Sequence, residues 1–258
     1  MLGLIWKVVR TGALVALALF TVFVVYEVFT FPRVSELRAK NPETTSMIET
    51  RLKEAREQGR EPRRVQQWVP LSRISPNLWR AVLAGEDTNF VSHNGFDYEA
   101  IQRAWEEGSK LSEREAKQEG DDDPSDWIPD LSRFKRGGST VSQQLAKNLY
   151  LSSERTAARK VKEAAITYFL ERSLTKCRIL EIYLNVIEWG DGVYGAEAAA
   201  QVYFRKPAAN LSPQEAAFLS AMIPSPLNVF NPQKNLRRVQ RRQRVILRGM
   251  NAVRLPQC

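Results

Sequence analysis

The chain has 258 residues, a formal net charge of +9, one histidine and two cysteines. Its length suits one catalytic domain with appendages and excludes a second complete enzyme, because a typical domain takes about 100–200 residues. A single histidine excludes the usual kinds of zinc site. Cys177 and Cys258 do not form a disulfide framework, so we expect a buried thiol and a frayed terminal one.

The N-terminal segment, residues 1–31, is predicted to hold one membrane-spanning helix over residues 4–31. No charged residue occurs from Thr11 to Tyr26, and a bilayer core requires about 20 mostly apolar residues of helix. The alternative is a cleaved signal peptide, whose apolar core would be only about 7–15 residues long. Basic residues on both sides of the helix leave its orientation undecided by charge: Lys7, Arg10, Arg33, Arg38 and Lys40.

Residues 32–70 are charged and punctuated by prolines, which is typical of a stalk, and a helix is predicted there from Ser46 to Gln58. From Leu71 onward apolar residues recur at helical spacing without a clear alternating pattern. The body, residues 71–235, is therefore predicted to be mostly α.

Charge is unevenly distributed along this body. From Glu106 to Asp130 there are ten acidic and three basic residues, and such a segment with few apolar residues indicates an exposed, mobile acidic insert, residues 106–134. The rest of the chain is strongly basic, which suits anionic lipid headgroups or pyrophosphate-bearing substrates.

The last segment, residues 236–258, is predicted to be a basic helix. Apolar residues alternate with its arginines, as in helices that lie on an anionic membrane surface or are simply solvated on one side. Six arginines crowd this segment: Arg237, Arg238, Arg241, Arg242, Arg244 and Arg248.

Adjacent carboxylates and the only histidine lie close together between two predicted helices. Glu86 and Asp87 are followed by Phe90 and His93. Paired acids of this kind can divide proton abstraction from charge stabilisation. Glu86 is therefore a candidate general base.

A second polar cluster follows a pair of glycines. Thr140 and Gln143 fit the capping-box pattern that opens a helix. By itself this pattern is equally typical of a surface helix with a solvated polar side. The polar residues that would share one face of this helix are Thr140, Gln144, Lys147 and Asn148.

The next predicted helix carries Arg159, Lys160 and Glu163. Arg159 and Glu163 are one turn apart, and a bare pair of this kind is usually a surface salt bridge of about 0.5 kcal/mol or less. The pair becomes a candidate part of a functional site only in combination with the two polar clusters that precede it in the chain.

With these residues in order, the chain resembles the peptidoglycan glycosyltransferase family, specifically its monofunctional membrane-anchored members, which are related to the glycosyltransferase domain of class A penicillin-binding proteins. The resemblance runs from about Leu71 to Pro232 and covers five motif regions in sequence. They are Glu86-Asp-x-x-Phe-x-x-His-x-Gly-x-Asp97, Gly137-Gly-Ser-Thr-x-x-Gln-Gln-x-x-Lys-Asn148, Arg159-Lys-x-x-Glu163, Ile179-Leu-Glu-x-Tyr-Leu-Asn185 with the segment up to Phe204, and Leu211-Ser-x-x-Glu215 with Pro224.

The resemblance implies a lysozyme-like helical fold with a single transmembrane helix, in an enzyme that polymerises lipid II into β-1,4-linked glycan strands and releases undecaprenyl pyrophosphate. It implies a single-pass protein of the cytoplasmic (inner) membrane, with its amino terminus on the cytoplasmic side and its catalytic domain on the outer face. Lipid II, the growing glycan strand and membrane lipids are the expected partners, and nucleic acid is not. Because no transpeptidase module follows, crosslinking is expected from a separate cell-wall synthesis protein.

The expected reaction inverts the anomeric carbon, since an α-linked pyrophosphate gives a β bond. One carboxylate must then activate the acceptor hydroxyl while cations stabilise the departing diphosphate. We expect Glu86 to act on the 4-hydroxyl of the lipid II N-acetylglucosamine, and burial beside Phe90 and Asp87 to raise its pKa. The groups expected to bind substrate near the pyrophosphate are Thr140, Gln144, Lys147, Asn148, Arg159 and Lys160.

Several roles remain open at this level. Glu163, the second predicted catalytic glutamate, either holds a divalent metal against the pyrophosphate or orients Arg159. Mg²⁺ is an expectation carried by the resemblance, and no organic cofactor is expected. Asp87 and His93, placed in the substrate site with Phe90, could instead be structural.

Two other functions compete with this one. A lytic glycosidase of the same broad fold would cut glycan with a single acid, but a neutral sugar polymer does not require the cations Lys147, Arg159 and Lys160. A membrane-tethered scaffold would explain the basic surface, but not the paired acids at Glu86.

Overall fold

The computed structural model describes residues 2–102, 106, 139–152 and 156–258. The chain divides into two compact units, Met1–Arg33 and Val34–Cys258. Apart from Glu106, the predicted acidic insert lies outside the described residues. The same is true of Gly137 and Gly138 in the second motif region.

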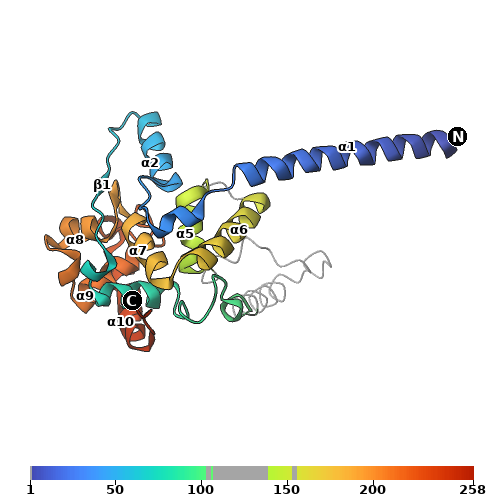
Figure 1. The fold of residues 1–258 in the computed structure, drawn as a ribbon. Coiled ribbons are helices and arrows are strands. Elements are labelled where there is room, and N and C mark those ends of the chain that lie inside the picture. Colours follow the sequence, from blue (N-terminus) through green and yellow to red (C-terminus); the bar gives the residue numbers. More distant parts are fainter. Residues whose placement is uncertain (1, 103–105, 107–138, 153–155) are drawn as a thin grey trace, which may run out of the picture. The chain divides into compact units, whose positions relative to one another are not determined.

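The first unit is the helix α1 (Leu2–Phe29), shown in dark blue in Figure 1. A helix is therefore present where the sequence predicted one. Large apolar side chains on it are exposed, among them Trp6, Leu14, Leu17 and Val22. In the part of the chain that the structure describes, no helix was found that combines the length and the apolarity needed to cross a bilayer. The membrane span stays a prediction.

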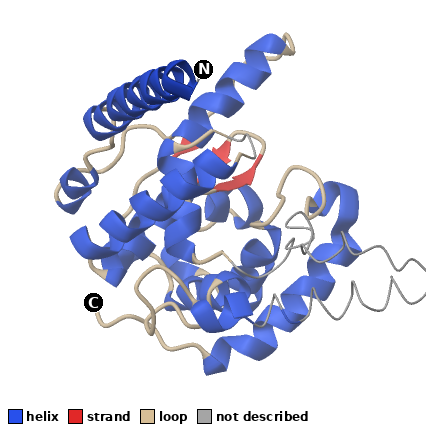
Figure 2. Cartoon of the chain, turned by 90° about the vertical axis from the view of Figure 1, so that its right-hand side faces the viewer, coloured by secondary structure: helices blue, strands red, loops and turns tan. Residues whose placement is uncertain are grey.

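The second unit is mostly helical, as predicted, and helices dominate the view in Figure 2. Its 3₁₀ turns are short connections at the ends of the larger elements. The helices are η1 (Val34–Arg38), α2 (Ser46–Glu57), η2 (Leu71–Arg73), α3 (Pro76–Glu86), α5 (Val141–Tyr150), α6 (Ala157–Ser173), α7 (Lys176–Val186), α8 (Ala196–Phe204), η5 (Ala208–Asn210), α9 (Pro213–Met222), α10 (Pro232–Gly249) and η6 (Met250–Ala252).

Hydroxyl and amide caps explain where many of these helices begin. Such side chains accept hydrogen bonds from the first backbone N–H groups, which have no partner inside the helix. The predicted capping box is confirmed: Thr140 Oγ1 accepts from the N–H of Gln143 at 3.2 Å, and the Gln143 side chain accepts from the N–H of Thr140 at 2.9 Å. The side chains that cap helices in this way are Thr45, Ser75, Thr140, Thr156, Thr175, Ser212 and Asn231.

A small sheet, which the sequence analysis did not predict, joins distant parts of the chain. Its strands are β1 (Val65–Gln66), β2 (Glu188–Gly190) and β3 (Val193–Tyr194), in the order β1-β3-β2. β1 is parallel to β3, and β2 is antiparallel to it. Strands of two or three residues are too short to show the alternation of apolar and polar residues by which a strand is predicted from sequence.

The helix α7 lies at the centre of the second unit, and nearly all its later side chains are buried. Asn185 on this helix forms two hydrogen bonds with Val69, accepting from its N–H and donating to its carbonyl, each at 3.0 Å. The segment predicted as a stalk also contributes to this core, since Val34, Leu37 and Ile48 are buried. This unit therefore begins at Val34, inside the segment that was predicted as a stalk.

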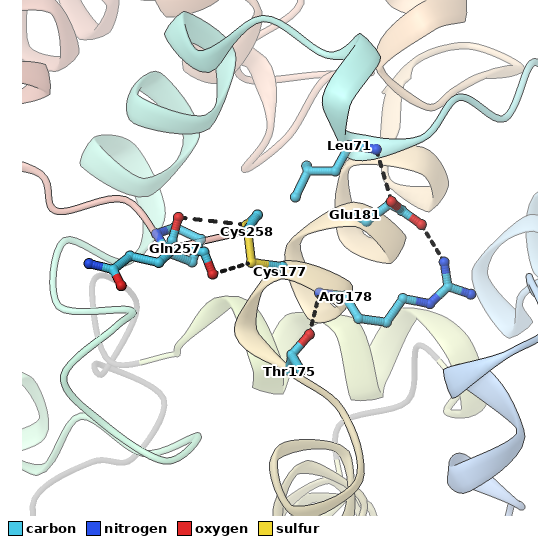
Figure 3. Close-up of a disulfide and its surroundings, with 8 residues drawn as sticks. Leu71, Thr175, Cys177, Arg178, Glu181, Gln257 and Cys258 are labelled. Atoms are coloured by element: carbon cyan, nitrogen blue, oxygen red, sulfur yellow. Dashed lines mark hydrogen bonds and ion pairs between the residues drawn. A yellow bond between two sulfur atoms is a disulfide. The ribbon is translucent and has the colours of Figure 1, made fainter.

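The expectation of two unpaired cysteines was wrong. Cys177 at the start of α7 and the terminal Cys258 form a disulfide, with their Cα atoms 5.7 Å apart across 81 positions of sequence (Figure 3). The pairing depends on the return of the tail from α10 and η6 to α7. Sequence spacing carries no information about that return.

Gly195, the residue before α8, is required by both conformation and space. Its φ is +83°, and a Cβ there would lie 2.7 Å from the carbonyl oxygen of Asn185. We expect Gly195→Ala to lower the free energy of unfolding by more than the roughly 1–2 kcal/mol that a left-handed φ costs a non-glycine residue. Gly59→Ala is the matched control, since Gly59 also has a positive φ but has nothing within 4 Å of such a Cβ. Equal losses for the two variants in urea unfolding would contradict this reading.

Candidate active site

Glu86 is the last residue of α3, where Ser75 and Pro76 start the helix and Asp87 ends it. Its carboxylate is only 9 % exposed. Oε2 accepts a hydrogen bond from Nε2 of Gln144 at 2.9 Å, and Oε1 lies 2.7 Å from Nη2 of Arg242. Helices α3, α5 and α10 thus converge on one carboxylate.

Burial raises the pKa of the Glu86 carboxyl above its ordinary value. The charge of Arg242 and the hydrogen bond from Gln144 act in the opposite direction, and the neighbouring charge of Asp87 adds to the rise. The predicted direction is confirmed. A base of raised pKa is better matched to taking a proton from a hydroxyl near neutral pH.

Gln144 is oriented by a buried tyrosine. The hydroxyl of Tyr183 on α7 donates to Oε1 of Gln144 at 2.7 Å, which leaves the Nε2 amide to donate to Glu86. Tyr183 is fully buried, and burial raises the pKa of its phenol well above the ordinary value, so it remains a donor. Gln144 was expected near the pyrophosphate, whereas its amide contacts the candidate base.

Asp87 and His93 join the end of α3 to the start of α5. Oδ1 of Asp87 lies 2.9 Å from Nε2 of His93, and Oδ2 accepts from the N–H of Val141 at 2.9 Å. Nδ1 of His93 accepts from the N–H of Gly95 at 3.1 Å. Two of these three contacts bind backbone N–H groups and the third joins the two side chains to each other, which favours the structural alternative for this pair.

Two residues predicted to bind substrate are buried in the core. Phe90 is completely inaccessible, with Nζ of Lys176 4.5 Å from its ring centroid. Thr140 is 3 % exposed, and its hydroxyl donates to the carbonyl of Gly95 at 2.7 Å while capping α5. Neither side chain reaches a surface open to substrate. Both hold the elements that carry the exposed polar groups.

The third motif region forms a cluster of charges on α6. The carboxylate of Glu163, 4 % exposed, accepts from Arg159 Nη1 at 2.9 Å and from Lys160 Nζ at 2.5 Å. Lys160 is half-exposed, whereas Arg159 is largely covered. Nε of Arg159 is buried and has no hydrogen-bond partner within the described residues. The protein residues that the structure describes therefore leave this donor unsatisfied.

The structure does not bring the two predicted catalytic glutamates into contact. Within the described residues, Glu86 bonds to Gln144 and Arg242, and Glu163 bonds to the two cations of its own helix. Helix α5 packs against α6. Half-buried Lys147 and Asn148 follow Gln144 along α5. The polar face of α5 therefore extends from the candidate base toward its C-terminal end.

The candidate metal ligands are already satisfied by the protein. Both oxygens of Glu163 are paired with cations, so a metal ion there would have to displace them. Asp87, His93 and Asp97 have ligand atoms within 4.8 Å of one another. However, Asp97 accepts from the N–H of Ala100 and from Asn89, both at 2.9 Å, and the other two residues hold backbone as described above. These residues do not fit a metal centre.

Arg242 was predicted only as part of the basic C-terminal helix, with no role in the site. A local signal for it existed. Val239 and Ile246 are the buried apolar residues of α10, and Arg242 is three residues after the first and four before the second, on the same face. A charge on an apolar face predicts a buried partner, although the sequence does not say which one.

Most of the second unit matches one family model. Residues 52–120 and 128–251 match the family described as Transglycosylase, a match that includes α3, α5, α6, α7 and α10. The chain belongs to the transglycosylase family. The predicted family and enzyme class are thereby confirmed: this is a peptidoglycan glycosyltransferase, an enzyme that polymerises glycan strands in the cell envelope.

Relatives of this transglycosylase match it over nearly their whole length. It is 43 % identical over 251 residues to the biosynthetic peptidoglycan transglycosylase of Laribacter hongkongensis, covering 97 % of this chain and 99 % of the relative. It is 42 % identical over 239 residues to that of Chromobacterium violaceum, covering 93 % and 96 %. The corresponding Neisseria gonorrhoeae protein is 38 % identical, covering 92 % of each chain. The similarity therefore extends beyond the motif regions.

Proposed function

We propose that this transglycosylase uses lipid II as its substrate, with Glu86 as the general base. The observation that carries the proposal is the buried Glu86 carboxylate, whose two oxygens are oriented by Gln144 and Arg242 and whose pKa is raised by burial. Glu86 takes the proton of the acceptor 4-hydroxyl as that oxygen attacks the anomeric carbon of the donor. The bond from this carbon to the lipid pyrophosphate breaks, and its electron pair leaves with the diphosphate. Because the acceptor oxygen attacks from the side opposite the leaving group, the anomeric centre is inverted.

The departing diphosphate carries negative charge that cations must stabilise. We assign this role to Arg159 and Lys160 on α6 with Lys147 on α5. The unpartnered Nε of Arg159 supports the assignment, because a buried donor without a partner is rare in a native structure and a phosphate oxygen would satisfy it. Glu163 then holds the two α6 cations in place, and no metal is needed for that function.

Several observations support a position at the outer face of the cytoplasmic membrane. The apolar side chains of α1 are exposed, and α6 also exposes Val161, Tyr168 and Phe169. Such surfaces suit contact with lipid. The Cys177–Cys258 disulfide supports placing the second unit outside the cytoplasm, because cytoplasmic thiols are usually kept reduced. We propose that α1 anchors the enzyme with its amino terminus inside.

The role of the α6 cations is tested with Arg159→Gln. We expect the rate of polymerisation of labelled lipid II in detergent to fall on the order of 100-fold, because one preorganised charge at the leaving group is lost. Arg172→Gln is the matched control on the same helix, since Arg172 is exposed in the last turn of α6. A rate equal to that of the control would contradict the assignment.

The same assay separates the remaining alternatives. Addition of a chelator should leave the initial rate unchanged if Glu163 holds cations, whereas loss of activity restored by Mg²⁺ would establish a metal requirement. Incubation with purified cell-wall sacculi should release no fragments. Release of fragments would indicate a lytic glycosidase instead. A scaffold without enzymatic activity would show neither reaction.

A further inference from the structure

Arg242 directs its described hydrogen bonds at the end of α3. Its Nη2 lies 2.7 Å from Oε1 of Glu86 and 2.9 Å from the carbonyl oxygen of Gly85. The guanidinium carbon lies 5.5 Å from the ring centroid of Phe230, and the side chain is 27 % exposed. Its Nε is buried without a hydrogen-bond partner in the described residues. Arg242 is thus held by one aromatic face and by the base itself.

The approach of α10 to the base depends on the absence of a side chain at Gly85. A Cβ there would lie 2.8 Å from Oγ of Ser220 on α9 and 3.2 Å from Cδ1 of Ile246 on α10. Both distances are shorter than normal contacts, so a side chain at this position would force Ser220 and Ile246 to shift where α9 and α10 pack on the last turn of α3. Arg242 lies on the α10 face that this packing turns inward.

The groups around Glu86 leave Arg242 as its single cationic partner in the described structure. Gln144 from α5 is neutral, Tyr183 from α7 acts through that amide, and Asp87 on the same chain segment is negative. An opposite charge at this distance stabilises an ionised carboxylate that burial would otherwise protonate. Removing it would leave a buried charge without a counter-ion.

We propose that Arg242 is the positioning residue of the catalytic base, keeping Glu86 ionised and fixing the carboxylate between α5 and α10 so that it faces the acceptor hydroxyl. The inference rests on the proposed role of Glu86. It places the basic C-terminal helix in the catalytic machinery. A purely structural alternative exists, because an arginine that bonds to the last carbonyls of a helix also caps it.

The pH dependence of kcat/KM separates the two roles. Glu86 must be ionised to act, so activity declines as pH falls through its pKa. For Arg242→Gln in the full chain, we expect this acid limb to move to higher pH by about one unit or more, as for loss of a close opposite charge. The deficit of the variant relative to wild type should therefore be roughly tenfold larger below the limb than on the alkaline side, where only the loss from the less well positioned carboxylate remains.

Two further variants complete the test. Arg242→Lys keeps the charge but not the forked geometry, so its acid limb should stay near that of the wild type while kcat falls. Arg241→Gln, at the exposed neighbouring position, should leave the pH profile in place. A drop that is uniform across pH for Arg242→Gln, or an acid limb of Arg242→Lys that moves as far as that of the glutamine variant, would overturn the proposal. Should Glu86→Gln remain active, the base assignment fails first and independently.

Discussion

Replacing Glu86 by glutamine should reduce lipid II polymerisation by a factor on the order of 10²–10⁴, the usual contribution of a positioned general base. Glutamine preserves the size of the side chain and can still accept from Gln144 or Arg242, but it cannot take the acceptor proton. Burial raises the pKa of Glu86, so the folded state disfavours its ionised form, and the neutral glutamine should leave the melting temperature close to that of the wild type. The two measurements together distinguish lost chemistry from lost folding.

Glu57→Gln is a suitable control for this experiment. Glu57 is exposed at the end of α2, and its one ion pair among the described residues is a long one with Lys53 at 3.7 Å. The wild-type enzyme should also lose activity on the acid side at a pH above the ordinary glutamate range, because the pKa of Glu86 is raised. Polymerisation by Glu86→Gln at the wild-type rate would mean that another group accepts the proton.

Loss of the disulfide should produce the largest change in stability. The bond between Cys177 and Cys258 closes a loop of 81 positions that contains α8, α9 and α10. Constraint of the unfolded chain over a loop of this length corresponds to about 4 kcal/mol. We expect Cys258→Ser to lower the free energy of unfolding by an amount of this order in urea titrations at equilibrium.

A reducing agent supplies the matched control. It should destabilise the wild-type chain about as much as Cys258→Ser, and it should have no effect on a Cys177→Ser, Cys258→Ser double variant. If reduction changes the stability of the wild type by less than about 1 kcal/mol, the tail is held to α7 by its packing and the covalent bond adds little.

Much of the helical framework follows from local sequence. Thr140 and Gln143 cap α5 through bonds that span three residues, and Arg159 and Glu163 meet because they are one turn apart. Interactions of this range depend on residues a few positions apart, so their pattern is visible in the chain itself. The motif regions around Glu86 could be found for the same reason.

The tertiary structure alone determined the partners of those residues. Arg242 meets Glu86 across 156 positions, β1 pairs with β3 at Val65 and Val193, and Cys258 returns to Cys177. Each of these contacts requires a long loop to close, and residue types at the two ends do not specify which distant partner the fold will bring near. The sequence by itself therefore established a helical transglycosylase with a candidate base, whereas only the packing of α5, α7 and α10 decided how that base is held.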